Sequence, residues 1–428
     1  MQCEKFRVAA SDSHSVSSLP ALGQQPTSRP TTPSTLLLGK DTIPAIIELV
    51  DNVEEGFLSA AVRDVQPGNL QFKLAPAYVL YMCCRYRVSP HYRTALNSIQ
   101  RGERLAQFLT KTANLLHVVV QDYCHDAEPL AFWMANTSEL LNFIKLDVHM
   151  GPRTVPEPQE SLADAVEKAF AHLTACLKVD LNAAIHAVLD TNLEDDQSTG
   201  PCLHMLSSSM TLLRHCRVNA ALTIQLFSQL FHHINMYLFN WLVSREGADY
   251  CCKAWGLSLN GRLERIQQWA LRQGLELAAE CHLDRIVQAV RLLETPKDID
   301  NLATLGSTCY KLNSLQVRSL LERYRPEPGE SPVSRDVMEN VVKMAENQAD
   351  EILRGDGRSI QVEEEVNLQL PFLLPEDGYS PDVIKGIPPG LQEFVDVLLS
   401  RGLCRMILQP TPSGLWTVHF STHGAKQV

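Results

Sequence analysis

The stretch from Asn219 to Val243, NAALTIQLFSQLFHHINMYLFNWLV, limits what this chain can fold into more than any other part of it. When its residues are spaced about 100° apart around a helix axis, the bulky apolar positions fall in one wedge roughly 100° wide. These positions are Phe227, Leu230, Phe231, Ile234, Leu238, Trp241 and Leu242. A stripe of this kind is typical of a helix packed against other helices, so we predict a core helix here.

The far side of the same predicted helix carries three further large side chains, His232, Met236 and Phe239. One hypothesis is that they form or border a groove where a partner helix or an extended peptide binds. The alternative is that a second helical layer covers them. Polar residues interrupt the stretch, so no uncharged apolar span of roughly 18 residues free of such groups occurs. The stretch is therefore not expected to span a membrane.

The composition indicates a globular, acidic protein. Hydrophobic residues make up 45% of the chain and charged residues 20%, which are values typical of folded domains. The net charge is −11, and no basic cluster with interleaved aromatic residues occurs, so nucleic acid is not an expected partner. The 12 cysteines are scattered singles and two adjacent pairs, and the N-terminal sequence lacks the apolar core of a signal peptide. We expect reduced, mostly buried thiols in a cytoplasmic protein.

Three regions follow one another along the chain. Residues 1–40 are rich in Ser, Pro, Thr and Gln, and we predict that they form a disordered leader because they carry too little apolar area to offset the entropy of ordering. Residues 41–354 hold the helical segments. Residues 355–428 change character, and we predict an extended tail that packs on the helices.

Segments with a period of about 3.6 residues run through the central region. A short amphipathic helix is expected to begin within Ile43 to Val50. Further helices are expected at 74–87, 105–119, 132–145, 162–188, 219–243, 263–270, 283–293, 315–324 and 334–353, with loops at 193–201 and 245–261. Trp133, Trp241 and Trp269 are expected to be structural. The prediction is an all-α fold, an irregular elongated bundle of about a dozen helices.

The predicted tail has a strand-like pattern. Apolar and polar residues alternate from Ile360 to Leu370, and the pair Met406 to Leu408 and Leu415 to Val418 flanks a Pro-Thr-Pro-Ser-Gly turn. This arrangement predicts a short β-like hairpin. The alternative is part of a separate small β domain.

A search for catalytic or metal-binding patterns finds two weak candidates. His232 and His233 with Cys251 and Cys252 could supply metal ligands, but adjacent residues on a helix point about 100° apart, and the CxxC or HxxxH spacing is missing. The run from Cys124 to Asp126 holds a thiol, an imidazole and a carboxylate, yet triads are usually assembled from distant segments. We therefore expect no catalytic residues, no cofactor and no metal site, and a helical metalloenzyme remains the alternative.

Six phrases in the chain, taken in order, resemble the dilute-domain (DIL) family. They are APAYVLYMCCRYR (75–87), FWMANTSELLNFIK (132–145), LFSQLFHHINMYLFNWLVSRE (226–246), the helix ending in Gln268 and Trp269, LDRIVQAVRLLE (283–294) and LNSLQVRSLLERYRPEPGE (312–330). The resemblance covers roughly residues 42 to 350. This family includes the globular tails of class V myosins, afadin, and the Ras-associating and dilute domain-containing and Ras-interacting proteins. The Ser/Pro-rich leader and the tail are most like the last two.

The resemblance implies a function in protein interaction without catalysis. It implies an all-α cytoplasmic scaffold in Rap/Ras-family small-GTPase signalling to cell adhesion and migration, located at cell junctions or the cytoplasmic side of the plasma membrane. The expected partners are junctional or signalling proteins. No Ras-associating domain is recognisable, so a small GTPase is expected to be reached indirectly. The alternative is a cargo-adaptor-like binding module similar to the myosin V tail.

Overall fold

The computed structural model describes residues 45–49, 52–89, 92–147, 150, 156–347, 359–364, 370 and 389–408. Within these ranges the chain forms 14 α-helices and one two-stranded sheet, which confirms the predicted all-α class. None of the described helices is long and apolar enough to cross a membrane. The cysteines of the described ranges are free thiols, and most are buried, as expected. The predicted leader at 1–40 and the predicted strand at 415–418 lie outside the described residues.

The chain divides into two compact units. The first comprises Met1–Leu173, Leu212–Leu222 and Leu370–Val428, and the second comprises Thr174–Thr211 and Thr223–Gln369. Each unit is described by itself.

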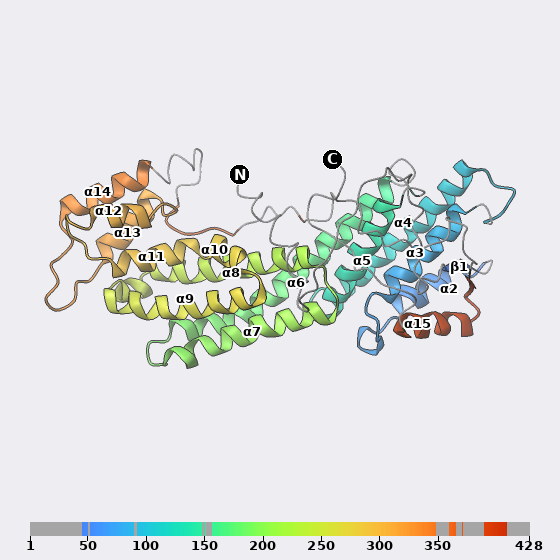
Figure 1. The fold of residues 1–428 in the computed structure, drawn as a ribbon, viewed down its shortest axis with the longest axis horizontal. Helices are drawn as coiled ribbons and strands as arrows, with labels where there is room; N and C mark the ends of the chain where they lie inside the picture. The colour runs from blue at the N-terminus through green and yellow to red at the C-terminus, as the bar shows by residue number, and fades with distance from the viewer. Residues whose placement is uncertain are drawn as a thin grey trace, which may run out of the picture. The chain divides into compact units, whose positions relative to one another are not determined.

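The first unit is built around one buried helix (Figure 1). Its elements are β1 (Ala45–Leu49), α2 (Glu54–Leu58), the π-helical turn η1 (Ser59–Arg63), the 3₁₀ turn η2 (Pro67–Asn69), α3 (Ala75–Val88), α4 (Ser98–Asp122), α5 (Ala127–Leu146), α15 (Pro389–Ser400) and β2 (Cys404–Leu408), with the first part of α6 (Pro156–Leu189). Helix α3 packs against β1, α4, α5 and α15. Because it is apolar nearly all round, it is buried from Ala75 to Arg87, as its sequence predicts.

Buried polar groups of the first unit are paired with each other. The Arg85 guanidinium donates to both carboxylate oxygens of Asp147 at 3.0 and 2.8 Å, and the Tyr81 hydroxyl donates to the same carboxylate at 2.9 Å. The Asn136 amide bridges two backbone segments, because its Oδ1 accepts from Ala77 N at 3.1 Å and its Nδ2 donates to Lys73 O at 2.8 Å. These contacts fix α3 to α5 and to the turn that follows α5.

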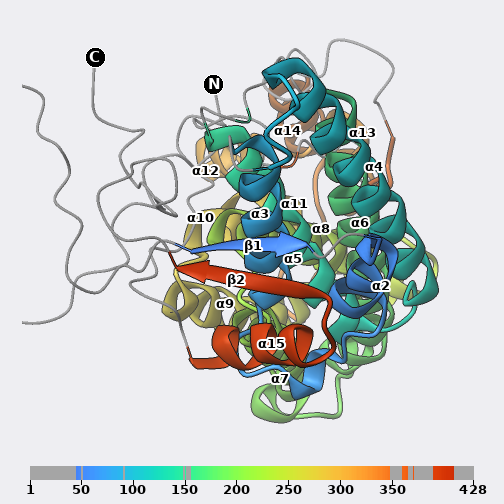
Figure 2. The ribbon, with the colours of Figure 1, turned by 90° about the vertical axis from the view of Figure 1, so that its right-hand side faces the viewer.

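One strand corrects the sequence analysis, and the other confirms a predicted strand at Met406 to Leu408 but pairs with a different partner than expected. Residues 45–49, predicted to be helical, form β1, which pairs in antiparallel register with β2, so that Ile47 lies opposite Met406 (Figure 2). The tail was expected to be extended, but residues 389–400 form the helix α15, which packs against α3 and β2. A run as short as AIIEL is compatible with the period of a helix, about 3.6 residues, and with that of a strand, 2 residues. Its strand partner lies more than 350 residues away in the chain, so local periodicity could not decide between helix and strand.

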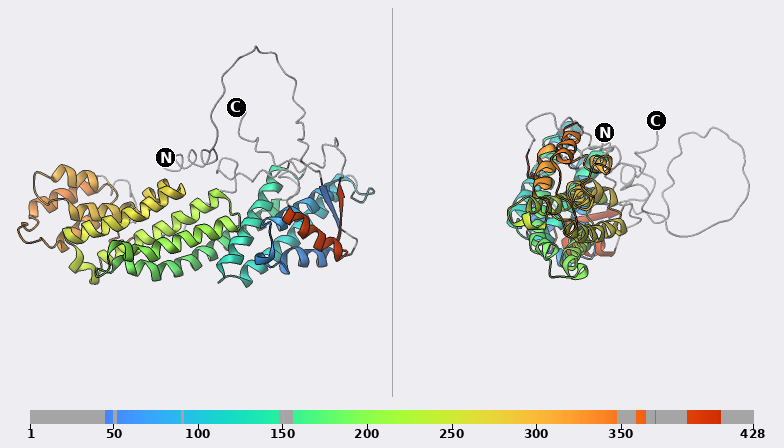
Figure 3. Two further views of the ribbon diagram at one scale, coloured as in Figure 1. Left: turned by 60° about the horizontal axis from the view of Figure 1, so that its bottom comes forward. Right: turned by 90° about the vertical axis from the view of Figure 1, so that its left-hand side faces the viewer.

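In its described residues, the second unit consists of helices, the turns that join them and one extended segment at residues 359–364. It contains the later part of α6, most of α7 (Asp195–His215) and α8 (Ala220–Leu242), the 3₁₀ turn η3 (Glu246–Tyr250), α9 (Lys253–Gln273), α10 (Glu276–His282), α11 (Asp284–Glu294), α12 (Leu302–Thr308), α13 (Ser314–Arg323) and α14 (Arg335–Ala345). Helix α9 packs against α10 and α11, and α14, drawn in orange, packs with α12 and α13 (Figure 3).

Helix α8 confirms the predicted core helix. Six of the seven positions of its apolar stripe are completely buried, and Trp241 is half-buried against the rings of Tyr250 and Trp255. The ring of Phe227 lies 5.5 Å from that of Trp269, whose Nε1 donates to Ser207 Oγ at 2.9 Å. Trp133 and Trp269 are buried, in agreement with their expected structural role.

Two helices are longer than the sequence predicts. Helix α7 begins at Asp195, inside the predicted loop 193–201, and continues through Pro201. Helix α9 begins at Lys253, inside the predicted loop 245–261. The Gly-Pro pair of the first stretch and the glycines of the second indicated loops, but contacts between distant residues favour the helices. Arg262 of α9 makes such contacts with the turn before α7.

Candidate functional site

A polar pocket of about 410 Å³ lies in the second unit. Its walls come from α8, α10, the start of α11, the turn before α13, α13 itself and an extended segment at residues 359–364, which we call the docked segment. The lining residues are His232, Asn235, Cys281, His282, Asp284, Arg285, Lys311, Asn313, Gln316, Ser359, Gln361 and Glu363. Apart from Cys281, the described residues that line the pocket have polar or charged side chains.

One asparagine side chain of α8 makes two hydrogen bonds to the docked segment. Asn240 Nδ2 donates to the carbonyl oxygen of Val362 at 2.9 Å, and Asn240 Oδ1 accepts from the backbone N–H of Val362 at 2.7 Å. An amide side chain thus pairs with both backbone groups of one residue, as a neighbouring strand would. The Val362 side chain is 2% exposed and is the apolar anchor of the docked segment.

The start of α13 supplies two further amides. Asn313 and Gln316 form a capping box, in which Asn313 Oδ1 accepts from Gln316 N at 2.8 Å and Gln316 Oε1 accepts from Asn313 N at 3.1 Å. Because the cap uses both side-chain oxygens, the amide nitrogens remain as donors. Asn313 Nδ2 donates to Ser359 O at 2.9 Å, and Gln316 Nε2 donates to Ile360 O at 3.2 Å.

Two basic residues bind the acidic end of the docked segment. His232 Nε2 donates to the carbonyl oxygen of Glu363 at 2.9 Å, which places the proton of a neutral His232 ring on Nε2. The ring of His232 lies edge to face with that of His282, with centroids 6.4 Å apart. Lys178 Nζ, on α6, lies 3.3 Å from the Glu364 carboxylate.

The opposite wall of the pocket carries charges of both signs. Lys311 Nζ lies 3.5 Å from the Asp284 carboxylate, and its backbone N–H donates to Gln288 Oε1 at 2.8 Å. Asn235 Oδ1 accepts from Ile286 N at 2.8 Å and so fixes the first turn of α11 to α8. The wall is therefore held in place by buried amides, whose hydrogen bonds give it a fixed shape.

The three residues predicted to bind a partner occupy different environments. His232 lines the pocket, Met236 is half-buried one turn further along α8, and Phe239 is completely buried. The neighbouring His233 faces α6, where its Nε2 lies 2.7 Å from Asn182 Oδ1, and burial together with the nearby Lys178 charge lowers its pKa. The pocket residues on α10, α11 and α13 were missed by the sequence analysis, although the N-x-x-Q spacing of Asn313 and Gln316 is a readable capping signal.

The other candidate groups have structural roles. Cys251 is buried, its Sγ contacts the carbonyl oxygens of Leu242 and Gly247, and burial raises its pKa to about 11. Asp126 is the N-cap of α5 and accepts from Glu128 N at 3.3 Å. Among the residues that the structure describes, no three His, Cys, Asp or Glu side chains are grouped to hold a metal ion.

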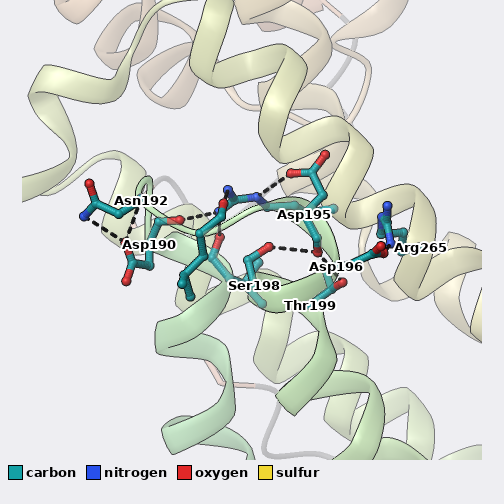
Figure 4. Close-up of polar contacts among 10 residues, drawn as sticks. Asp190, Asn192, Asp195, Asp196, Ser198, Thr199 and Arg265 are labelled. Carbon is teal, nitrogen blue, oxygen red and sulfur yellow. Dashed lines mark hydrogen bonds and ion pairs between the residues drawn. The ribbon is translucent and has the colours of Figure 1, made fainter.

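A second polar cluster holds the turn between α6 and α7 (Figure 4). The buried Arg262 of α9 donates to the backbone carbonyls of Val188, Asp190 and Leu193 at 2.7, 2.9 and 3.0 Å, and its Nε donates to Asp195 Oδ1 at 3.1 Å. Four of the five N–H donors of Arg262 are thus used by the chain itself. The cluster therefore shapes the start of α7 and is structural.

Comparisons with known proteins agree on one family. The DIL domain family matches residues 225–328. The chain is 23% identical to the Ras-associating and dilute domain-containing protein of Homo sapiens over 79% of this chain and 36% of that protein. It is 21% identical to unconventional myosin-Vb of Rattus norvegicus over 63% of this chain and 16% of that protein. The chain thus spans about a third or less of the length of these relatives.

Solved structures show the same fold. A structure described as a myosin V cargo binding domain matches 82% of this chain and 95% of its own chain, with a TM-score of 0.56 and 18% identity. The structure of Myo2-GTD in complex with Mmr1 matches 82% of this chain and 96% of its own, with a TM-score of 0.55 and 19% identity. This chain is therefore related to the dilute-domain proteins, with a DIL match at residues 225–328 and the fold of the myosin V cargo binding domain.

Proposed function

We propose that this chain is a non-enzymatic protein-interaction scaffold of the dilute-domain type. The observation that carries the proposal is the docked segment, because side chains of the second unit there hold an extended peptide by its backbone. All the pocket residues outside the docked segment lie within the DIL match. The proposal is supported by the likeness to Myo2-GTD, which was solved with the protein Mmr1.

The proposal extends to a pathway and a location. We propose that the chain acts in Rap/Ras-family small-GTPase signalling to cell adhesion and migration, in the cytoplasm at cell junctions or at the cytoplasmic side of the plasma membrane. The similarity to the Ras-associating and dilute domain-containing protein supports this role. The small GTPase is reached through another protein, and residues 41–354 form the interacting part between the leader at 1–40 and the tail at 355–428.

His232, Met236 and Phe239 keep their place in this proposal as partner-binding residues. His232 offers a hydrogen-bond donor at the pocket, Met236 offers a half-buried apolar side chain on the same helix, and Phe239 supports that helix from within the core. Mutation of His232 and Met236 should therefore act on binding, and mutation of Phe239 on stability as well.

A second candidate function is a cargo-adaptor-like binding module. The fold shared with the myosin V cargo binding domain favours it. This function requires a motor protein among the partners. Co-precipitation of a myosin heavy chain with the full chain would distinguish it from the signalling scaffold.

Affinity capture with the full chain tests the proposal. A tagged full chain and a tagged unrelated helical protein are expressed in epithelial cells, and the captured proteins are compared by quantitative mass spectrometry. We expect junctional or signalling proteins to be enriched with the full chain alone. Enrichment equal to that of the control protein would refute the scaffold function.

A second arm tests the small GTPase. Purified Rap loaded with a GTP analogue or with GDP is mixed with the purified chain. We expect no nucleotide-dependent binding by the pure chain, and recovery of Rap in the capture from cells. Direct GTP-dependent binding to the pure chain would contradict the indirect link.

A further inference from the structure

We propose that the groove occupied by the docked segment is a recognition site for an extended partner peptide with a β-branched residue followed by two acidic residues, and that residues 359–364 compete for it. This inference rests on the proposed function, since it names the chemistry of one partner. The chain's own segment, SIQVEE, is the template for that chemistry.

The polar contacts along the groove are made to the backbone of the docked segment. Asn240 pairs with the N–H and the C=O of Val362, and Asn313, Gln316 and His232 donate to three further carbonyl oxygens. Backbone groups are common to every peptide. A different chain in the same extended conformation would therefore satisfy the same donors, as in recognition by strand addition.

Two of the donors are fixed by hydrogen bonds that do not involve the docked segment. Asn313 and Gln316 are fixed by the capping box of α13, and both are buried. Asn240 projects from α8, the core helix of the unit. A groove whose donors are ordered in advance loses little entropy when a peptide binds.

Two positions of the docked segment give side-chain selectivity. Val362 is buried, whereas Ile360 is 42% exposed, so the groove encloses one apolar side chain. Lys178 Nζ lies 3.3 Å from the carboxylate of Glu364, and His232 donates to the backbone carbonyl oxygen of Glu363. The buried position selects a compact apolar residue, and the charges of Lys178, Arg285 and Lys311 favour acidic residues after it.

The pocket leaves room beyond what the chain's own segment fills. Ser359, Gln361 and Glu363 line it, whereas Val362 is buried, which follows the alternation of side chains along an extended backbone. The remaining volume is about 410 Å³, with Arg285 and Lys311 on the opposite wall. A partner with an acidic residue in place of Ser359 or Gln361 would bring a further negative charge into the pocket that these two basic residues line.

The docked segment is suited to exchange. One buried apolar side chain anchors it, and its remaining contacts are hydrogen bonds and one partly exposed ion pair. Its advantage over a partner is its high effective concentration as part of the same chain. Weakening that anchor should open the groove to peptide in solution.

Fluorescence anisotropy with a labelled peptide tests the proposal on the full chain. The probe has the sequence of residues 357–366. We expect Val362→Ser to bind it at least tenfold more tightly than the wild-type chain does, because the competing segment is released. Ile360→Ser, the same kind of change at an exposed position of the same segment, should leave the affinity at the wild-type value.

Three further arms keep the result interpretable. Adding Asn240→Leu to Val362→Ser should abolish the gain, and a probe with Asp in place of its valine should not bind. A chain with residues 359–364 replaced by Gly-Ser repeats should bind the probe as Val362→Ser does, which covers the case that Val362→Ser misfolds.

The outcomes separate this inference from the proposed function. Equal probe affinity of the wild-type, Val362→Ser and Gly-Ser chains would overturn the inference, even if capture from cells succeeds. Undiminished binding after Asn240→Leu would overturn it as well. Tight binding of the probe by the opened chains together with failed capture from cells would support the groove and refute the broader scaffold function.

Discussion

Replacement of Arg262 by alanine should destabilise the second unit far more than replacement of Arg265, three residues further along α9. The Arg262 side chain is 2% exposed and donates four hydrogen bonds, three of them to backbone carbonyls of the turn between α6 and α7. Arg265 is paired with Asp196 at the surface, where the two side chains are 41% and 79% exposed. The two arginines share a helix and contact adjacent aspartates, so they form a matched pair.

The expected magnitude follows from these contacts. A hydrogen bond from a charged donor contributes roughly 1.5–3 kcal/mol, and each buried carbonyl oxygen left without its donor costs roughly 1–3 kcal/mol. The four bonds share one side chain and do not add, so we expect Arg262→Ala to lower the free energy of unfolding by about 4 kcal/mol. An exposed ion pair contributes about 0–1 kcal/mol, which is the expected effect of Arg265→Ala.

Thermal unfolding followed by tryptophan fluorescence measures the difference. Three of the chain's five tryptophans, Trp241, Trp255 and Trp269, lie in the second unit. The Arg262 guanidinium lies 5.2 Å from the ring centre of Trp255, so a large part of the signal reports on this unit. A change of about 1 kcal/mol shifts Tm by roughly 2–4 °C in a domain of this size, so Arg262→Ala should lower Tm by roughly 8–16 °C. A decrease no larger than that of Arg265→Ala would refute the assignment of Arg262 as the clamp of this turn.

Burial lowers the pKa of Lys297 to about 8. Because the folded chain loses this proton at a lower pH than the unfolded chain does, the unfolded chain binds more protons between pH 8 and 10. In that range the free energy of unfolding of the wild-type chain, relative to that of Lys297→Met, should rise by up to about 1.4 kcal/mol per pH unit. Urea unfolding of both proteins at pH 7 and 9.5 checks this, and a constant difference would contradict it. Phe239→Ser should lower the free energy of unfolding by about 3 kcal/mol or more because that side chain is completely buried, and Met236→Ser should lower it by less than half as much. Equal losses in urea unfolding would show that the two side chains are equally packed. In the native chain, maleimide should label the exposed Cys281 more than tenfold faster than Cys202, because burial raises the pKa of the Cys202 thiol to about 12. Mass spectrometry of labelled peptides measures the ratio of the two rates, and similar rates would exclude the described burial of Cys202.

The sequence was sufficient to predict those helices whose apolar pattern is strong. Helices α3 and α8 were located within one or two residues, because an all-round apolar surface and a continuous stripe each require burial among other helices. The strand β1 was missed because its five residues gain their hydrogen bonds from β2 at the other end of the chain. The start of α7 was missed because Arg262 stabilises it across 67 residues of sequence.

The site was harder to predict than the fold. His232 was singled out because it is a large side chain on the far side of a predicted core helix, and it lines the pocket, whereas Phe239 on the same side is completely buried. Lys311 and Arg285 were not found, since they come from different parts of the chain and neither carries a signal of its own, and the capping spacing of Gln316 indicates a helix start without indicating a pocket. Their common feature is a shared pocket, and a shared pocket exists only after folding.

The chemistry of the groove sets how selective it can be. A side-chain amide that caps a helix with its oxygen must direct its nitrogen elsewhere, and at Asn313 and Gln316 that direction is toward a peptide backbone. Such donors raise affinity for any extended chain but do not discriminate between sequences. Discrimination is left to the enclosed site of Val362 and to the Lys178 charge, and one methyl-sized difference in an apolar site changes affinity only about 10- to 200-fold. A groove built in this way favours a set of related acidic peptides over a single partner, and its selection among them must come from additional contacts in the pocket.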